Sequence, residues 1–313
     1  WYKNAVVYQV YPFSFMDSDN DGWGDIPGII SKLDYIKDLG VTAIWFSPLY
    51  KSPDYDYGYD ISDYRDIMDE FGTMEDMQRL IDEGNKRGIK MIMDLVVNHT
   101  SDQHEWFKKS IEDPTSKYHN YYHWYKGKGK RRPNNWMSTF AGPAWEYNEK
   151  LDEYYLHLFA IEQPDLNMDN PEVRQEVKDI MKFWLDMGVD GFREDVITFV
   201  SKRNGLPTGF PIPQACGMEH YADGPNIHKY LTEFRQVLNK YDCFVVGEAP
   251  MMTVNKALKY IKEGPEQELD MMFHFQHMEA DCLFMDCLSF PFSLKKLKKA
   301  FSKWQTGLYG KSW

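Results

Sequence analysis

The sequence predicts an α/β fold of the (β/α)8 TIM-barrel type, and three observations support this class. First, apolar strand-like runs alternate with helix-like stretches, the pattern of parallel strands joined by crossover helices. Second, three of these runs end in an acidic residue, namely Met91–Asp94, Asp190–Asp195 and Phe244–Glu248. Third, 313 residues with 43% hydrophobic content suit one barrel with a large core. In such a barrel the functional residues lie where the strands finish.

The expected elements alternate along the chain. The expected strands are Val6–Tyr11, Ala43–Ser47, Lys90–Val97, Val189–Val196, Cys243–Glu248 and Asp270–Phe275. The expected helices are Pro27–Leu39, Met74–Arg87, Pro171–Met187, Asn226–Lys240, Thr253–Lys262 and Leu294–Trp304. Pro27 and Pro171 fit first-turn positions, and Gly40, Gly88 and Gly188 fit the positions where helices stop.

Two long segments interrupt this alternation. Residues 99–170 are crowded with aromatic side chains and lack helical periodicity, apart from a short piece near Asp102–Ile111. A second stretch, Thr198–Pro225, is rich in Gly and Pro. Long loops in compact domains are usually functional or form small subdomains. We therefore expect a first barrel portion over 1–98, an inserted loop-rich domain after the third strand over 99–170, and a second barrel portion over 171–313.

The chain supplies about six of the eight βα units that a closed barrel of this type needs. Six strands alone leave open sheet edges and an exposed core seam. We therefore expect the sequence to be part of a longer protein, truncated before the seventh strand and inactive by itself.

The composition argues against some classes of binding partner and favours one cellular location. A formal net charge of −12 argues against nucleic acid or an anionic membrane, because both attract basic surfaces. No apolar run approaches the length of a membrane span, and no signal-like leader is recognised. Few cysteines and no leader favour the cytoplasm, although a removed signal peptide would leave the same sequence. The four cysteines, which lack metal-ligand spacing, are Cys216, Cys243, Cys282 and Cys287.

Two acidic residues at strand ends are candidates for catalysis. Asp195 follows Arg193 by two residues, so both side chains point to the same face of an extended strand. The arginine favours the ionised aspartate, which suits a nucleophile. Glu248 ends an apolar run, where a neighbouring carboxylate favours a protonated acid. Retaining glycosidases use such a pair. The alternative is an ordinary buried ion pair beside a strand-end glutamate.

Asp94 and His99 flank the apolar end of another expected strand. The histidine suits a hydrogen bond to a sugar hydroxyl. It suits equally well a capping role in the loop that leaves the strand, and the spacing alone favours this second interpretation.

The segment Asp17–Asp25 carries an acidic side chain at Asp17, Asp19 and Asp21, and Gly22 permits a turn. This alternation resembles the first half of a calcium loop, since calcium takes about 6–8 oxygen ligands. A complete EF-hand is excluded, because Gly28 stands where its last glutamate would lie. A solvated acidic turn is the alternative.

Four motifs give a specific resemblance to a known family. They are Asp94–His99, Gly191–Ile197, Val246–Ala249 and Gln163–Asn167. Through them the chain resembles, over essentially its whole length, the α-amylase superfamily (glycoside hydrolase family 13). Within that superfamily it is most similar to the oligo-1,6-glucosidase and α-glucosidase group.

The resemblance implies roles for matched residues. It implies Asp195 as the nucleophile and Glu248 as the general acid/base, and it associates Val196 with α-1,6 preference. It also implies structural calcium and no organic cofactor. The implied substrate-binding residues are Asp56, Tyr59, Asp94, His99, Phe140, Phe159, Gln163, Arg193 and Val196. The implied calcium ligands are Asp17, Asp19, Asp21 and Asp25, with Trp23 through its carbonyl.

The chain also departs from the family pattern. Glu194 stands where many members have an apolar residue, and Asp19 stands where asparagine is usual. The family's fourth motif, which supplies a third catalytic carboxylate, would lie beyond Trp313.

The leading hypothesis is a retaining exo-α-glucosidase that removes terminal α-1,6-linked glucose from isomaltose and short isomalto-oligosaccharides. A trehalose-6-phosphate hydrolase or a sucrose isomerase of the same fold is the alternative within the superfamily. A non-catalytic, glycosidase-like binding subunit or an inactive fragment is the alternative of another class. The partner in the leading hypothesis is a small oligosaccharide, and the oligomeric state stays open.

Overall fold

The computed structural model describes residues 1–127, 129, 131–212, 215–283 and 288–312; Cys287 lies outside them. Its centre is a six-stranded parallel sheet in the order β1-β2-β5-β9-β10-β11. The strands are β1 (Val7–Val10), β2 (Ala43–Phe46), β5 (Lys90–Leu95), β9 (Gly191–Glu194), β10 (Phe244–Ala249) and β11 (Met271–His274). All six expected strands are confirmed. In the described residues they form part of a parallel β/α barrel, with β1 and β11 at its edges.

The helices follow the strands as expected, with one correction. The main ones are α4 (Met74–Arg87), α6 (Pro171–Met187), α8 (Ile227–Leu238), α9 (Val254–Ile261) and α10 (Leu294–Leu308). A capping box formed by Thr73 and Asp76 starts α4. Gly88 and Gly188 end α4 and α6 in the left-handed conformation, at φ of 72° and 108°.

The correction concerns the first expected helix, Pro27–Leu39, which is broken into α2 (Ile26–Ser31) and α3 (Leu33–Asp38). The hydroxyl of Ser31 donates to the carbonyl of Gly28 at 2.6 Å. This bond competes for the carbonyl that would accept from Lys32 in a continuous helix. The amide of Lys32 donates instead to the carbonyls of Ile29 and Ile30.

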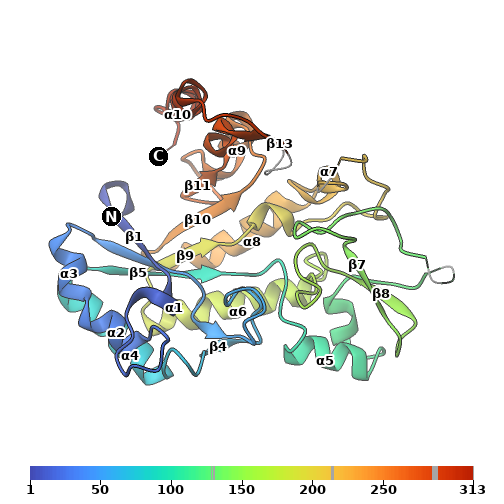
Figure 1. Ribbon diagram of the computed structural model, residues 1–313, viewed down its shortest axis with the longest axis horizontal. Coiled ribbons are helices and arrows are strands. Elements are labelled where there is room, and N and C mark those ends of the chain that lie inside the picture. The colour runs from blue at the N-terminus through green and yellow to red at the C-terminus, as the bar shows by residue number, and fades with distance from the viewer. Residues whose placement is uncertain (128, 130, 213–214, 284–287, 313) are drawn as a thin grey trace.

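The segment between β5 and α6 contains more regular structure than its composition suggested. It holds α5 (Glu105–Glu112) and a three-stranded antiparallel sheet in the order β6-β8-β7. These strands are β6 (Trp124–Tyr125), β7 (Trp145–Asn148) and β8 (Glu153–Leu156). Figure 1 shows α5 and this sheet on the side of the molecule opposite α2, α3 and α4. The boundaries 1–98, 99–170 and 171–313 stay predictions.

Large aromatic side chains pack this segment onto the loop that follows β9. Trp136 and Trp145 are buried together with Phe199 and Tyr221, which come from that loop. The Trp136 indole N–H also donates to the carbonyl of Pro207 at 2.9 Å. Trp136 and Trp145 therefore help to build a second, smaller core. Other aromatic residues of this segment, among them Trp106, Tyr121 and Tyr155, belong to the main core.

The remaining elements are short. A hairpin of β3 (Tyr50–Lys51) and β4 (Asp63–Ile67) follows β2, and β12 (Cys282–Leu283) pairs with β13 (Leu288–Ser289). Short helices are α1 (Pro12–Phe15) and α7 (Met218–Tyr221). Among the described residues, we find no helix with the length and apolarity that crossing a membrane requires. The cytoplasmic location stays a prediction.

Candidate active site

Charged side chains from three neighbouring strands lie together at the carboxyl-terminal end of the parallel sheet. The register places Asp94 of β5 level with Arg193 of β9, and Arg193 level with Val246 of β10. Glu248 therefore lies two residues further along β10, at the level of Asp195. Because parallel strands finish at the same edge, their carboxyl ends bring these groups together.

Arg193 lies at the centre of this group. Its Nη1 donates to Asp94 Oδ1 at 2.8 Å and to Asp195 Oδ1 at 2.6 Å. Its Nη2 donates to Glu248 Oε2 at 2.7 Å, and the same oxygen accepts from the amide of Val196 at 3.0 Å. One guanidinium thus contacts three carboxyl groups, all of them largely removed from solvent.

Burial changes the proton affinity of this group. It raises the pKa of Asp195 to about 6, while the charge of Arg193 acts in the opposite direction. Burial, reinforced by the charge of Asp195, raises the pKa of Glu248 to about 7. The pKa of Glu248 is raised further because the charge of Asp195 adds to the effect of burial, whereas the charge of Arg193 opposes the rise at Asp195. Burial also raises the pKa of Asp94 to about 6.

A polar cluster adjoins this group. Gln163 Nε2 donates to Asp56 Oδ2 at 2.9 Å and lies 3.1 Å from His99 Nε2. His99 Nε2 also lies 3.2 Å from the carbonyl oxygen of Tyr59. Burial lowers the pKa of His99 to about 4, so its imidazole is neutral at neutral pH. Burial raises the pKa of Asp56 to about 6.

Aromatic side chains connect the two clusters. The Tyr59 hydroxyl donates to Asp94 Oδ2 at 3.1 Å, and its ring centre lies 5.8 Å from the Arg193 guanidinium. The ring of Phe159 lies 5.1 Å from that of His99 and 5.5 Å from that of Phe140. Phe140 is 54% exposed, so it lies at the outer limit of the site.

Val196 follows Asp195 in an unusual conformation. Its φ is +33°, in the left-handed region that β-branched residues rarely adopt. This turn directs its amide to Glu248 Oε2. The backbone between the two acidic residues is therefore part of the site.

Trp45 of β2 also belongs to this group, although no sequence pattern predicted it. Its indole N–H donates to Asp94 Oδ2 at 3.2 Å, and its ring centre lies 5.1 Å from the Arg193 guanidinium. Trp45 also lines a cavity of about 420 Å³ together with Arg193, Glu248 and Phe273. β2 lies next to β5, the strand that carries Asp94. The alternation of side chains along β2 could therefore have revealed Trp45.

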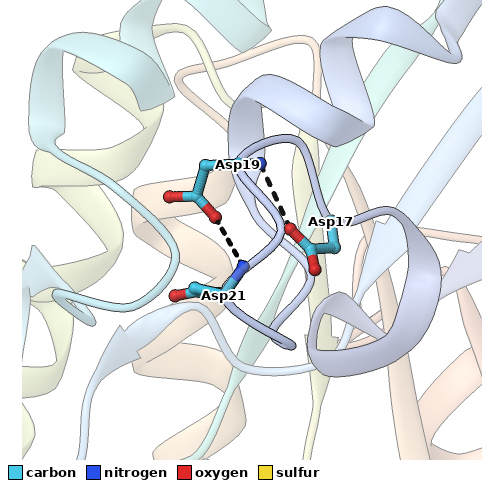
Figure 2. Close-up of side chains that lie close together, drawn as sticks. All are labelled: Asp17, Asp19 and Asp21. Atoms are coloured by element: carbon cyan, nitrogen blue, oxygen red, sulfur yellow. Dashed lines mark hydrogen bonds between the residues drawn. The ribbon is translucent and has the colours of Figure 1, made fainter.

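The acidic loop shares no residue with this site. Asp17, Asp19 and Asp21 each offer one carboxylate oxygen, and these oxygens lie within 4.8 Å of one another. Figure 2 shows the three side chains, with the amides of Asp19 and Asp21 donating to the preceding aspartates. Carboxylate oxygens are the donors that hard cations prefer, so the three residues fit a metal ion.

The other two implied ligands are Asp25 and Trp23, and the Trp23 carbonyl stays a predicted ligand. Asp25 is outside the three-residue group: its Oδ1 accepts from the amide of Gly28 at 2.5 Å and caps α2. Its Oδ2 accepts from the amide of Ser18 at 2.8 Å. The amide of Trp23 donates to Asp21 at 2.8 Å, and its ring packs against Phe13.

Comparison with known proteins agrees with this architecture. The family model described as "Alpha amylase, catalytic domain" matches residues 9–313. The chain belongs to the α-amylase family. The chain is 54% identical to an oligo-1,6-glucosidase of Parageobacillus thermoglucosidasius, covering 100% of this chain and 56% of the relative. It is 46% identical to a trehalose-6-phosphate hydrolase of Bacillus subtilis (strain 168), and this match also covers 100% of this chain and 56% of the relative.

Solved α-amylase family structures share the fold. A variant of the trehalulose synthase MutB, solved with its substrate sucrose, has a TM-score of 0.95 and 42% identity. The match covers 100% of this chain and 56% of that one. The chain thus spans a little over half the length of the α-amylase family members it matches, and these include glucosidases, a phosphosugar hydrolase and a sucrose-converting enzyme.

Proposed function

We propose that the native protein carrying this chain is a retaining exo-α-glucosidase that releases terminal α-1,6-linked glucose from isomaltose and short isomalto-oligosaccharides. The observation that carries this proposal is the pair Asp195 and Glu248, held by one Arg193 guanidinium where β9 and β10 end. Retaining glycoside hydrolysis requires two carboxyl groups whose pKa values differ.

The proposed mechanism has two displacement steps. Asp195 attacks the anomeric carbon as the glycosidic bond breaks, and Glu248 gives its proton to the leaving oxygen. A water molecule then attacks the same carbon, gives its proton to Glu248 and displaces the Asp195 carboxylate. Two inversions leave the released glucose with the starting configuration. Burial supports these roles, because the pKa of Glu248 is raised to about 7 and that of Asp195 to about 6.

We propose that the cluster of Asp56, His99 and Gln163 binds the hydroxyl groups of the terminal glucose. The three side chains meet within hydrogen-bonding distance, and sugar hydroxyls both donate and accept. The ring of Tyr59, beside Arg193, offers an apolar face to the sugar ring. Phe140, Phe159 and Val196 border the same site and complete the proposed set.

The linkage preference rests on two observations. Val196 follows the proposed nucleophile, and the chain is 54% identical to an oligo-1,6-glucosidase. A trehalose-6-phosphate hydrolase is the second candidate, because one at 46% identity matches the whole chain. Sucrose isomerisation is a further candidate within the family. Retention of both Asp195 and Glu248 argues against a non-catalytic binding subunit.

We also propose that the loop at Asp17, Asp19 and Asp21 binds calcium as a structural ion. Three carboxylate oxygens within 4.8 Å support a hard cation there. The loop lies outside the proposed catalytic group, so the ion would stabilise the fold and take no part in the reaction.

Product analysis tests the proposed activity. The native protein is incubated separately with isomaltose, maltose, sucrose and trehalose 6-phosphate, and the products are followed by chromatography and proton NMR. We expect glucose from isomaltose faster than from maltose, released first as the α-anomer. Faster turnover of trehalose 6-phosphate, or conversion of sucrose to an isomer, would overturn the proposed substrate class.

A further inference from the structure

Lys202 is buried deep beside the proposed sugar-binding cluster. It lies in the loop after β9, and only 1% of its side chain is exposed. Its ammonium lies 2.7 Å from Asp165 Oδ2 and 2.8 Å from Asn98 Oδ1. Asn98 follows β5, and Asp165 comes from the segment that precedes α6. One ammonium therefore joins three separate segments of the chain.

The ammonium determines how the Asn98 amide is turned. A lysine ammonium can only donate hydrogen bonds, so the amide oxygen of Asn98 must face it. The amide nitrogen is then left to donate to Asp165 Oδ2 at 3.2 Å, and it lies 3.2 Å from His99 Nδ1.

The amide in turn determines where the proton of His99 lies. Because the Asn98 nitrogen donates to Nδ1, that ring nitrogen must be unprotonated in the neutral imidazole. The ring proton therefore lies on Nε2, which faces the carbonyl of Tyr59 at 3.2 Å and lies beside Gln163. That N–H is directed at the Tyr59 carbonyl, so the imidazole is held between Asn98 and Tyr59, beside the Gln163 amide of the proposed sugar site.

We infer that Lys202 is a positioning residue for the sugar-binding histidine: it fixes the amide of Asn98, and that amide holds the proton of His99 on Nε2. This inference rests on the proposed function, since it assigns His99 to the sugar. Lys202 itself contacts no part of the proposed catalytic pair. Its replacement should weaken sugar binding more than it slows the chemical step.

The experiment uses the native protein with the variants K202M and K202M/D165N. The single variant leaves the buried Asp165 carboxylate without its cation and risks failing to fold. The double variant removes both charges and keeps the test possible. K90M is the matched control, because Lys90 forms a 2.6 Å ion pair with Asp190. This pair lies where β5 and β9 begin, at the other end of these strands from the proposed site.

Three measurements are made on each folded variant. They are the ¹⁵N ring shifts of His99, assigned against H99Q, the inhibition constant of glucose, and the kinetics with p-nitrophenyl α-glucoside. We expect K202M/D165N to lose the pure Nε2–H signature and to raise both KM and the glucose inhibition constant about tenfold. Its kcat should fall less than about threefold. K90M should leave all three readouts unchanged.

Several outcomes separate this inference from the proposed function. A folded K202M/D165N variant with an unchanged His99 signature and an unchanged glucose inhibition constant would overturn the role of Lys202. A native protein that binds glucose but fails to cleave isomaltose would overturn the proposed substrate, and the glucose and NMR readouts would still decide on Lys202. A native protein with no affinity for glucose would overturn both.

Discussion

Two acidic clusters in this chain use the same kind of side chain in opposite surroundings. Asp94 and Asp195 are buried, and Glu248 is largely buried, around Arg193 where parallel strands end. Asp17, Asp19 and Asp21 lie on an outer loop, where the partners of Asp17 are backbone amides. Burial raises the pKa of Glu248 to about 7, whereas the Gly22 amide lowers the pKa of Asp17.

The difference indicates what each cluster can do. A buried carboxyl with a raised pKa can exchange a proton near neutral pH, which suits catalysis. An exposed carboxylate with a lowered pKa stays ionised and suits a cation, which needs deprotonated ligands.

The largest effect is expected in the buried cluster. D195N should lower kcat at least about 10⁴-fold, because it replaces the proposed nucleophile with a neutral amide of the same shape. Steady-state hydrolysis of p-nitrophenyl α-glucoside measures this loss, and circular dichroism checks the fold. D17N, in the exposed cluster, is the control and should keep kcat within about twofold. Near-normal turnover by D195N would exclude Asp195 as the nucleophile.

A buried acid outside both clusters is expected to affect stability. Glu194 is fully buried, and its carboxyl oxygens have no hydrogen-bond partner among the described residues. Its charged neighbours are Arg235 of α8 and the acids Glu268 and Asp270. Burial raises its pKa to about 8 from an ordinary 4.5. Between pH 4.5 and 8, Glu194 therefore holds a proton in the folded protein and loses it in the unfolded chain.

The sign of the effect follows from that proton. Between pH 4.5 and 8 the free energy of unfolding should fall by up to about 1.4 kcal/mol per pH unit through this group alone. It should not change further through Glu194 outside that window. Denaturant unfolding of E194Q across the range should lack this slope, while E75Q, at an exposed acid, should keep it. Parallel pH dependences in native protein and E194Q would contradict the burial argument.

The pH dependence of the reaction should be bell-shaped. Activity needs Asp195 ionised and Glu248 protonated, and their pKa values are raised to about 6 and about 7. We expect kcat/KM to be highest between these values and to fall up to tenfold per pH unit on either side. D19N, in the exposed cluster, should keep the same profile. A profile flat from pH 5 to 8 would exclude this pair of roles.

The sequence predicted the parts that depend on local pattern. Strand ends, the stop at Gly88 and the acids at Asp195 and Glu248 could be read from periodicity and spacing. The break at Ser31 could not, because it depends on whether a hydroxyl bonds a carbonyl of its own helix. Trp45 and Lys202 were missed for a different reason: their roles depend on partners in distant segments, and neither residue type signals such a role by itself.

The smallest effect is expected from removing a cation from the exposed cluster. A ligand that binds only the folded state stabilises it by about 2.7 kcal/mol at 100 times its dissociation constant. We therefore expect millimolar calcium to raise the melting temperature by several degrees over protein in EDTA, with kcat unchanged. D21N should lose most of this shift, because it removes one of the three carboxylates. D82N, which changes an exposed acid on α4, should keep it. Equal shifts in D21N and D82N would place the cation elsewhere, and the exposed cluster would then be a solvated turn.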